Sequence, residues 1–202
     1  LWEYALENVA GGNFSQHPVL LTESVASNHV AREKSIEIML EALNVPGVQL
    51  AKAAPLSLFS SGVLTGIAVE SGHSFTQIVP VFEGYDLPYS TATLPVAGQE
   101  ITAYLAKLLG ERGFRMLTRA DLSVVNSIKE RLCYISTDFE RELQQPDTMQ
   151  QYTLPDQQTI KVGSERFRCT EPYFLPKLLV LPSAPLPEMV CNALTKCDPA
   201  VQ

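Results

Sequence analysis

The segment VESGHSFTQIVP, residues 69 to 80, contains residue types that could bind a phosphate group. Its apolar ends predict two strands, and Ser71 and Gly72 predict a tight turn between them. A turn with an acid shortly before a glycine can bind an anion, because closely spaced backbone N–H groups point to one spot. The acid is Glu70, but His73 follows the glycine, where a phosphate-and-metal site would need a second acid. The residues alone leave open whether this is a working phosphate loop or the remains of one.

A second group of polar side chains follows one face of a helix predicted after Thr118, with Asp121 placed to complete a capping box. The apolar face of this helix consists of Leu122, Val125, Ile128 and Leu132. The opposite stripe consists of Asn126, Lys129, Glu130 and Cys133. A polar stripe of this kind is usually a solvated surface, so its spacing does not by itself indicate a binding site.

No other residues form a known catalytic or metal-binding motif. The four cysteines, Cys133, Cys169, Cys191 and Cys197, include no C-x-x-C pair, which argues against a structural zinc site and for a reducing compartment. No G-x-S-x-G, Walker or H-E-x-x-H motif is present. The sequence therefore predicts neither a catalytic residue nor a metal ligand.

Composition excludes some classes of partner. The chain has 202 residues, 46% of them hydrophobic, which is enough for one large domain or two small ones. Its net charge is −7, with 15 basic and 22 acidic residues, so it is a poor candidate for binding nucleic acid. No run of 18 apolar residues predicts a membrane span. The chain starts with Leu1 and without a charged-then-apolar leader, so we expect no secretory signal and a missing upstream segment.

Alternating strands and helices predict an α/β chain. Strands are expected at 18–22, 48–51, 64–69, 76–81, 152–154 and 159–162. Helices are expected at 2–7, from after Ser27-Asn28 to before Asn44, from Pro55 to before Gly62, from after Gly98 to Gly110, after Thr118, and at 188–196, with a polar loop at 144–151.

Several long phrases of the sequence resemble actins. They are HPVLLTES (17–24), AREKSIEIMLEALNVP (31–46), VPVFEGYDLP (79–88), AGQEITAYLAKLLGERGF (97–114), IKERLCYISTDFEREL (128–143) and VGSERFRCTEPYFLP (162–176). The match is nearly continuous from Trp2 to about Asp198, and it covers only the middle of an actin. A sugar kinase or chaperone ATPase of the same superfamily is disfavoured by the actin-specific phrase LPDQQTIKVGSERFRC.

The resemblance implies a divergent, short actin-related protein with a partial fold of the ribonuclease-H-like kind, shared with hexokinase and the heat-shock chaperones. We expect a mixed sheet and a helical subdomain 4. Residues 1–60 resemble part of subdomain 1, residues 61–96 with 185–202 resemble subdomain 3, and residues 97–184 resemble subdomain 4. The helix at 31–43 would then lack the sheet that it covers in actins, leaving Leu40 and Leu43 in water at about 1.5–3 kcal/mol each.

The resemblance also answers the question raised by the turn. Actins have an acid at both turn positions, whereas this chain has Glu70 and His73, and their histidine after the turn is Gln77. The glutamine that orients the attacking water in actins corresponds to Ala53. Phosphoryl transfer to water depends on such positioning groups. The shell of a phosphate loop therefore remains without its chemistry, and it consists of Ser71, Gly72, Ser74 and Phe75, with Glu70 in the place of the first acid.

The nucleotide and partner surfaces of actins have further counterparts. Gly98, Lys129 and Glu130 match residues around the adenine and ribose, and amides at Gln99 and Asn126 replace arginines there. A groove that binds apolar helices of barbed-end partners corresponds to Ser61, Gly62, Tyr85 and Leu87. The loop at 174–187, with Leu179 and Leu181, matches a lateral filament contact, although a buried connector explains its apolar character equally well.

The leading hypothesis is a non-catalytic structural protein of a cytoskeletal assembly in the cytoplasm. Its expected partners are cytoskeletal proteins such as actin, capping-type proteins or other actin-like proteins, with no nucleic acid, membrane or cofactor. One alternative is a nucleotide-binding actin-like ATPase that forms filaments and uses ATP or ADP with Mg²⁺. Another is a chromatin-remodelling subunit in the nucleus.

Overall fold

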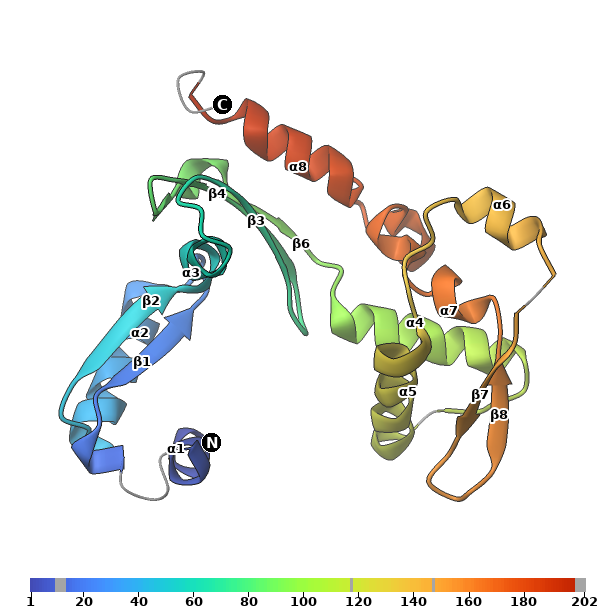
Figure 1. Ribbon diagram of the computed structural model, residues 1–202, viewed down its shortest axis with the longest axis horizontal. Helices are drawn as coiled ribbons and strands as arrows, with labels where there is room; N and C mark the ends of the chain where they lie inside the picture. The colour runs from blue at the N-terminus through green and yellow to red at the C-terminus, as the bar shows by residue number, and fades with distance from the viewer. Residues whose placement is uncertain (10–13, 117, 147, 199–202) are drawn as a thin grey trace. The chain divides into compact units, whose positions relative to one another are not determined.

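The computed structural model describes residues 1–9, 14–116, 118–146 and 148–198, which form two compact units. The first unit contains residues 1–69, 79–91 and 196–202. The second contains residues 70–78 and 92–195. Figure 1 labels the α-helices and most of the strands, and each unit is described by itself.

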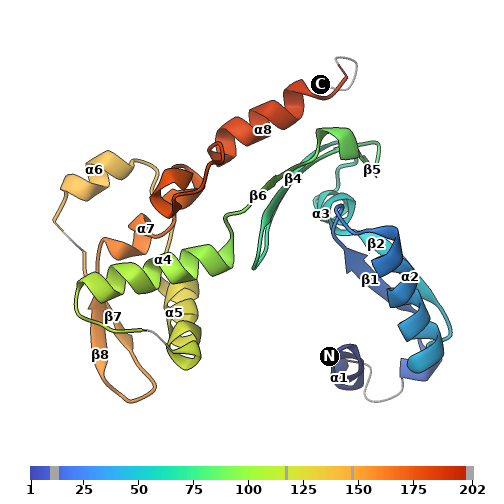
Figure 2. The same cartoon turned by 180° about the vertical axis from the view of Figure 1, so that it is seen from behind.

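The first unit begins with α1 (Trp2–Val9) and the short turn η1 (Phe14–Gln16). Strands β1 (Val19–Glu23) and β2 (Val48–Lys52) pair in parallel, with Val19 opposite Val48. They are connected by α2 (His29–Glu37) and a π-helical turn η2 (Ile38–Ala42), as parallel strands require a crossover (Figure 2). The Asn28 side chain caps α2 by accepting the Ala31 N–H at 2.7 Å.

Helix α3 (Ala53–Ser60) and four strands follow β2 along the chain and precede helix α4. The strands are β3 (Gly66–Ser71), β4 (Thr76–Phe82), β5 (Tyr85–Asp86) and β6 (Ala92–Leu94). The short turn η3 (Pro88–Ser90) lies between β5 and β6 in the chain. The order is β3-β4-β5, and β6 also pairs with β4 in antiparallel fashion. All but the last residue of β4 are buried.

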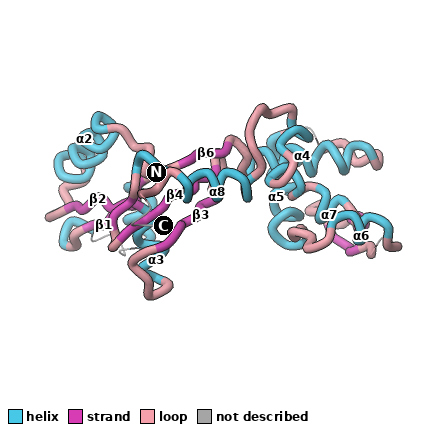
Figure 3. The backbone as a smooth tube through the Cα atoms, turned by 90° about the horizontal axis from the view of Figure 1, so that it is seen from above, coloured by secondary structure: helices cyan, strands magenta, loops and turns pink. Residues whose placement is uncertain are grey.

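The second unit is built on α4 (Gly98–Glu111) and α5 (Arg119–Leu132), which pack against each other (Figure 3). Then follow α6 (Phe139–Gln144), the antiparallel hairpin β7 (Gln150–Thr153) and β8 (Thr159–Val162), and α7 (Glu165–Arg168). The short turns η4 (Glu171–Tyr173) and η5 (Pro176–Leu179) lead to α8 (Leu186–Thr195). The core between these elements includes Leu105, Leu109, Val125 and Ile128.

The predicted α/β class is confirmed, and parallel and antiparallel pairing occur in different sheets. Thr118 and Asp121 form the predicted capping box of α5. The polar loop predicted at 144–151 is wrong at both ends, because Gln144 ends α6 and Gln150 begins β7. Short helices of one or two turns have too few residues to show a period, so α7 was not predicted.

The helix predicted to start after Ser27-Asn28 does so, with Asn28 as its N-cap, and its last turn widens into η2. Leu40 is exposed as expected, whereas Leu43 is half-buried. The assignment of segments to actin subdomains stays a prediction, since it rests on the resemblance to actins and the two compact units are defined by contacts within the chain. Among the described helices, none combines the length and apolar character that crossing a bilayer requires.

Candidate functional site

The turn between β3 and β4 is exposed and closed by hydrogen bonds at its base. The Gly72 N–H donates to the Phe75 carbonyl at 3.1 Å. The Ser71 hydroxyl lies 2.8 Å from Thr76 Oγ1 and 2.8 Å from the Tyr173 hydroxyl. The buried Thr76 hydroxyl donates in turn to the Val96 carbonyl at 2.7 Å. The predicted loop residue Ser71 therefore anchors the turn to the second unit's interior.

The first turn of α4 lies directly against this loop. The N–H of Gly98 donates to the Gly72 carbonyl at 3.0 Å, and that of Gln99 to the His73 carbonyl at 2.8 Å. These two donors are among those that a helix leaves unsatisfied at its N-terminus. A Cβ on Gly98 would lie 3.2 Å from the Gly72 carbonyl oxygen and 3.3 Å from Lys129 Nζ. Glycine is therefore needed here for close approach.

Lys129 joins α5 to the same helix turn. Its ammonium donates to the Gly98 carbonyl at 3.0 Å and to Thr102 Oγ1 at 2.9 Å. Asn126 Oδ1 lies 3.3 Å from Thr102 Oγ1, and Asn126 Nδ2 donates to Glu130 Oε1 at 2.7 Å. The polar stripe of α5 is thus a hydrogen-bonded network that holds α5 to α4.

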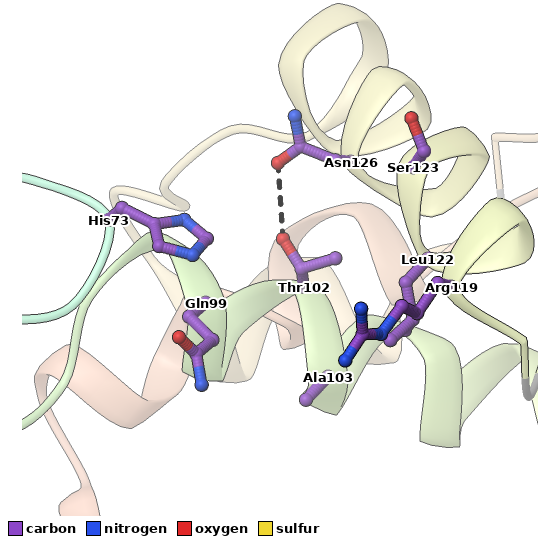
Figure 4. A pocket seen from close by; sticks show the side chains of 8 residues that line it. All are labelled: His73, Gln99, Thr102, Ala103, Arg119, Leu122, Ser123 and Asn126. Carbon is purple, nitrogen blue, oxygen red and sulfur yellow. Dashed lines mark hydrogen bonds between the residues drawn. The ribbon is translucent and has the colours of Figure 1, made fainter. Parts of the chain in front are cut away.

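An open pocket of about 510 Å³ lies beside this network. Figure 4 shows Asn126 and Thr102 in hydrogen-bond contact, His73 and Gln99 on one side, and Arg119 on the other. Its lining residues are His73, Gln99, Thr102, Ala103, Arg119, Leu122, Ser123 and Asn126. The lining includes one permanent cation, two amides, two hydroxyls and no carboxylate. Its volume falls in the range of small-molecule sites.

The residues predicted for a nucleotide site fall in one unit, and hydrogen bonds join Gly98 to Gly72 and to Lys129. Residues Glu70, Ser71, Gly72, Ser74, Phe75, Gly98, Lys129 and Glu130 all belong to the second unit. Lys129 and Glu130 belong to the network and not to the pocket lining. Gln77 is buried within β4 opposite Thr93, and Ala53 is the first residue of α3 in the first unit.

The donor set of the loop does not suit a hard divalent cation. Mg²⁺ prefers carboxylate oxygens and water in octahedral geometry. The loop offers one carboxylate, Glu70, and the imidazole of His73. Among the described residues, no group of three or more His, Cys, Asp and Glu side chains is arranged to hold a metal ion.

The residues of the predicted barbed-end groove cluster in the first unit. Gly62 lies two residues after the end of α3 with φ +76°, and the Gly84 N–H donates to the Leu64 carbonyl at 2.8 Å. Tyr85 is 78% exposed and Leu87 is half-buried. Their neighbours Phe59, Val63 and Leu64 are exposed apolar residues, and we name this set, with Ser61, Gly62, Tyr85 and Leu87, the first apolar patch.

The predicted filament-contact residues lie in a shallow groove of the second unit, which we name the second apolar patch. Its volume is about 610 Å³, and its lining includes Lys107, Tyr104 and residues 178–181. Val180 is 90% exposed and has a left-handed backbone with φ +58°. This left-handed backbone is costly for a β-branched residue, and it displays the apolar side chain of Val180 to solvent. In the same groove, burial raises the pKa of the Tyr104 phenol above its ordinary value.

Sequence reasoning missed three residues of the site. Thr102 contacts both Lys129 and Asn126, Tyr173 contacts Ser71, and Arg119 supplies the cation of the pocket. Thr102 follows Gly98 by one helical turn, and this spacing could have identified it. Tyr173 lies 102 residues after Ser71, and no local pattern connects them.

Comparison with known proteins gives two findings. The family model described as Actin matches residues 1–202. The chain is 41% identical over 202 residues to "Actin-related protein 2" from Arabidopsis thaliana, covering 98% of this chain and 52% of that protein. The chain therefore spans about half the length of the curated relative that it matches.

Proposed function

This chain belongs to the actin family, and from that premise we propose that it is a structural member of a cytoplasmic cytoskeletal assembly. It acts through contacts with other proteins and does not hydrolyse nucleotide. Its partners are actin, capping-type proteins or other actin-like proteins. The relative described as Actin-related protein 2 supports an assembly of this general kind.

The observation that carries the proposal is the chemistry of the loop and pocket. The loop retains its backbone closure through Gly72 and Gly98, but it pairs Glu70 with the imidazole of His73. Two amides that line the pocket beside it, Gln99 and Asn126, stand where the resemblance places arginines in actins. Ala53 has no polar atom with which to orient a water molecule. Positioning and charge stabilisation supply nearly all of the catalysis in phosphoryl transfer, so their loss abolishes turnover.

Phosphate release from MgATP by the purified protein tests the absence of catalysis. We expect a rate equal to that of a buffer blank, both alone and under conditions that polymerise conventional actin. The matched variant H73D restores a second carboxylate to the loop and tests whether that one group accounts for the lost activity. We expect this variant to be inactive as well, because Ala53 still cannot orient a water molecule. Turnover by the unaltered protein at conventional actin rates would refute the proposal.

The two apolar patches are the surfaces for partners. Co-sedimentation with actin filaments measures binding directly. We expect Val180→Asp in the second patch and Tyr85→Ser in the first each to weaken binding at least tenfold, because each places a polar group at an apolar contact. Tyr4→Ser changes an equally exposed aromatic residue in α1 and should leave binding unchanged. Equal binding by all three variants would exclude both patches.

A second candidate function is nucleotide binding without hydrolysis. It is favoured by the size of the pocket and by Arg119 and Lys129 near one face of α4. Titration calorimetry with ADP in the absence of Mg²⁺ distinguishes it from the first. Binding that is lost in Arg119→Ala and retained in the surface control Arg131→Ala would support it, and the absence of heat at millimolar ADP would refute it.

A further inference from the structure

Two cysteines of the second unit lie on segments that hydrogen bonds join to each other. Cys133 ends α5 and is half-buried, whereas Cys169 follows α7 and is fully buried. Both are free thiols, and Cys169 Sγ donates to the Arg166 carbonyl at 3.5 Å. Neither thiol lines the pocket beside the β3–β4 turn or either apolar patch.

Hydrogen bonds on both sides of the thiols hold their backbones in place. Arg166 Nε donates to the Leu132 carbonyl at 2.9 Å, and the Tyr134 N–H donates to the Arg166 carbonyl at 3.2 Å. The Thr170 hydroxyl donates to the Tyr134 carbonyl at 3.0 Å. The residue before Cys133, the residue after it, and the residue after Cys169 are thus fixed to the opposite segment. A disulfide requires such proximity, because two sulfurs join only when their Cβ atoms already lie close.

The two thiols differ in their readiness to react. Interaction with the Cys169 thiol lowers the pKa of the Cys133 thiol, and the charges of Arg166 and Lys129 act in the same direction against burial. The same interaction and burial raise the pKa of the Cys169 thiol. The thiolate is the attacking form of a cysteine, so Cys133, which is less buried than Cys169 and has the lowered pKa, reacts first.

We propose that Cys133 and Cys169 form a reversible redox modification site, which a small disulfide such as oxidised glutathione converts to an intramolecular disulfide. The Cys133 thiolate attacks one sulfur of the small disulfide, forming a mixed disulfide and expelling one thiolate. Cys169 then loses its proton and attacks the Cys133 sulfur, expelling the second thiolate. The protein loses two electrons and two protons, and the small disulfide gains both as two thiols.

Mass mapping of the full chain tests this assignment. The protein is equilibrated with oxidised glutathione, quenched in acid, alkylated under denaturing conditions and digested. We expect a peptide pair joined through Cys133 and Cys169, which dithiothreitol separates. In Cys169→Ser, where the resolving thiol is missing, Cys133 should keep glutathione as a stable adduct. The matched control Cys191→Ser removes an exposed cysteine of α8 and should leave the cross-link unchanged.

The time course in the unaltered protein gives an independent test should Cys169→Ser fail to fold. A glutathione adduct on Cys133 should appear and decay as the cross-linked pair accumulates. The proposal is overturned if that adduct persists at full occupancy without a cross-link. It is also overturned if both thiols are still alkylated when Cys191 has been modified.

Discussion

The two compact units differ in how completely they cover their apolar side chains. In the second unit, Leu105, Leu109 and Ile128 are fully buried in one continuous core. In the first unit, the core cluster consists of the smaller residues Ala54, Ala68, Val79 and Val81. There Leu20 of β1 is 58% exposed, and Val30 and Leu40 of the crossover are exposed as well.

This difference shows how little amphipathic patterning achieves without a surface to cover. Helices α4 and α5 bury their apolar faces against each other and against β8 residues such as Ile160. Helix α2 has a sound N-cap, but no residue of it is buried. Most of the stability of a helix in a protein comes from packing of its apolar face. The stability of the first unit therefore depends more than that of the second on a further surface that would cover its exposed apolar side chains.

Truncation of one leucine in each unit should separate them most clearly. Leu105→Ala removes a fully buried side chain from the second unit and should cost about 3–4 kcal/mol of unfolding free energy. Leu20→Ala removes an exposed side chain of the same type from the first unit and should cost less than about 0.5 kcal/mol. Urea denaturation followed by circular dichroism measures both. Equal losses would mean that the exposed strand face is covered in solution.

Sequence predicted those features that local patterning controls. The β3–β4 turn, the α5 capping box and the glycine at the start of α4 all follow from neighbouring residue types. The resemblance to actins also correctly identified the family. Glycine at 98 could be placed on a helix start, but its contact with the loop carbonyl is a tertiary feature that spacing does not encode.

What the sequence could not predict depends on long-range contact. The Ser71 and Tyr173 hydroxyls meet across 102 residues. Nothing in the sequence indicated that the segments of Cys133 and Cys169 are joined, because the two cysteines follow no motif spacing. The exposed Leu40 was predicted, since the helix at 31–43 has apolar residues that its own unit cannot cover.

Two ion pairs with similarly exposed cations refine the comparison between the units. Arg112 Nη1 lies 3.1 Å from Glu165 Oε2 in the second unit, and Lys52 Nζ lies 2.7 Å from Asp86 Oδ2 in the first. Arg112→Met should cost about 2 kcal/mol, because Glu165 is then left as a nearly buried unpaired carboxylate. Lys52→Met should cost about 1 kcal/mol, because Asp86 retains more solvent. Thermal unfolding at neutral pH measures both, and a larger loss in Lys52→Met would reverse the ranking of the units.

Glycine substitutions compare how tightly the backbone is packed in each unit. Gly98→Ala in the second unit should cost about 1 kcal/mol, because its Cβ would press on the Gly72 carbonyl oxygen at 3.2 Å. Gly47→Ala in the first unit should change stability by less than about 0.5 kcal/mol, because its Cβ would meet only Pro18 Cβ at 3.8 Å. Urea midpoints measure both. If Gly98→Ala is neutral, the loop is free to move away from α4.

The smallest expected effect concerns a charge that the second unit accommodates poorly. Burial raises the pKa of the Glu171 carboxyl above its ordinary value, and the nearby Glu140 acts in the same direction. A carboxyl with a raised pKa in the folded state opposes folding above that pKa and has no effect below its unfolded value. Glu171→Gln should therefore stabilise the protein by at most about 0.5 kcal/mol at pH 7, and this gain should vanish as the pH falls toward 4.

Melting temperatures of the Glu171→Gln variant and the unaltered protein between pH 4 and pH 8 measure this gain. Glu140→Gln is the matched control, because it removes the like charge and leaves the burial of Glu171 in place. It should give a smaller gain over the same pH range. If Glu171→Gln is instead destabilising at pH 7 and neutral at pH 4, the ionised carboxylate makes a favourable contact. The second unit would then stabilise this charge as well as it buries its apolar side chains.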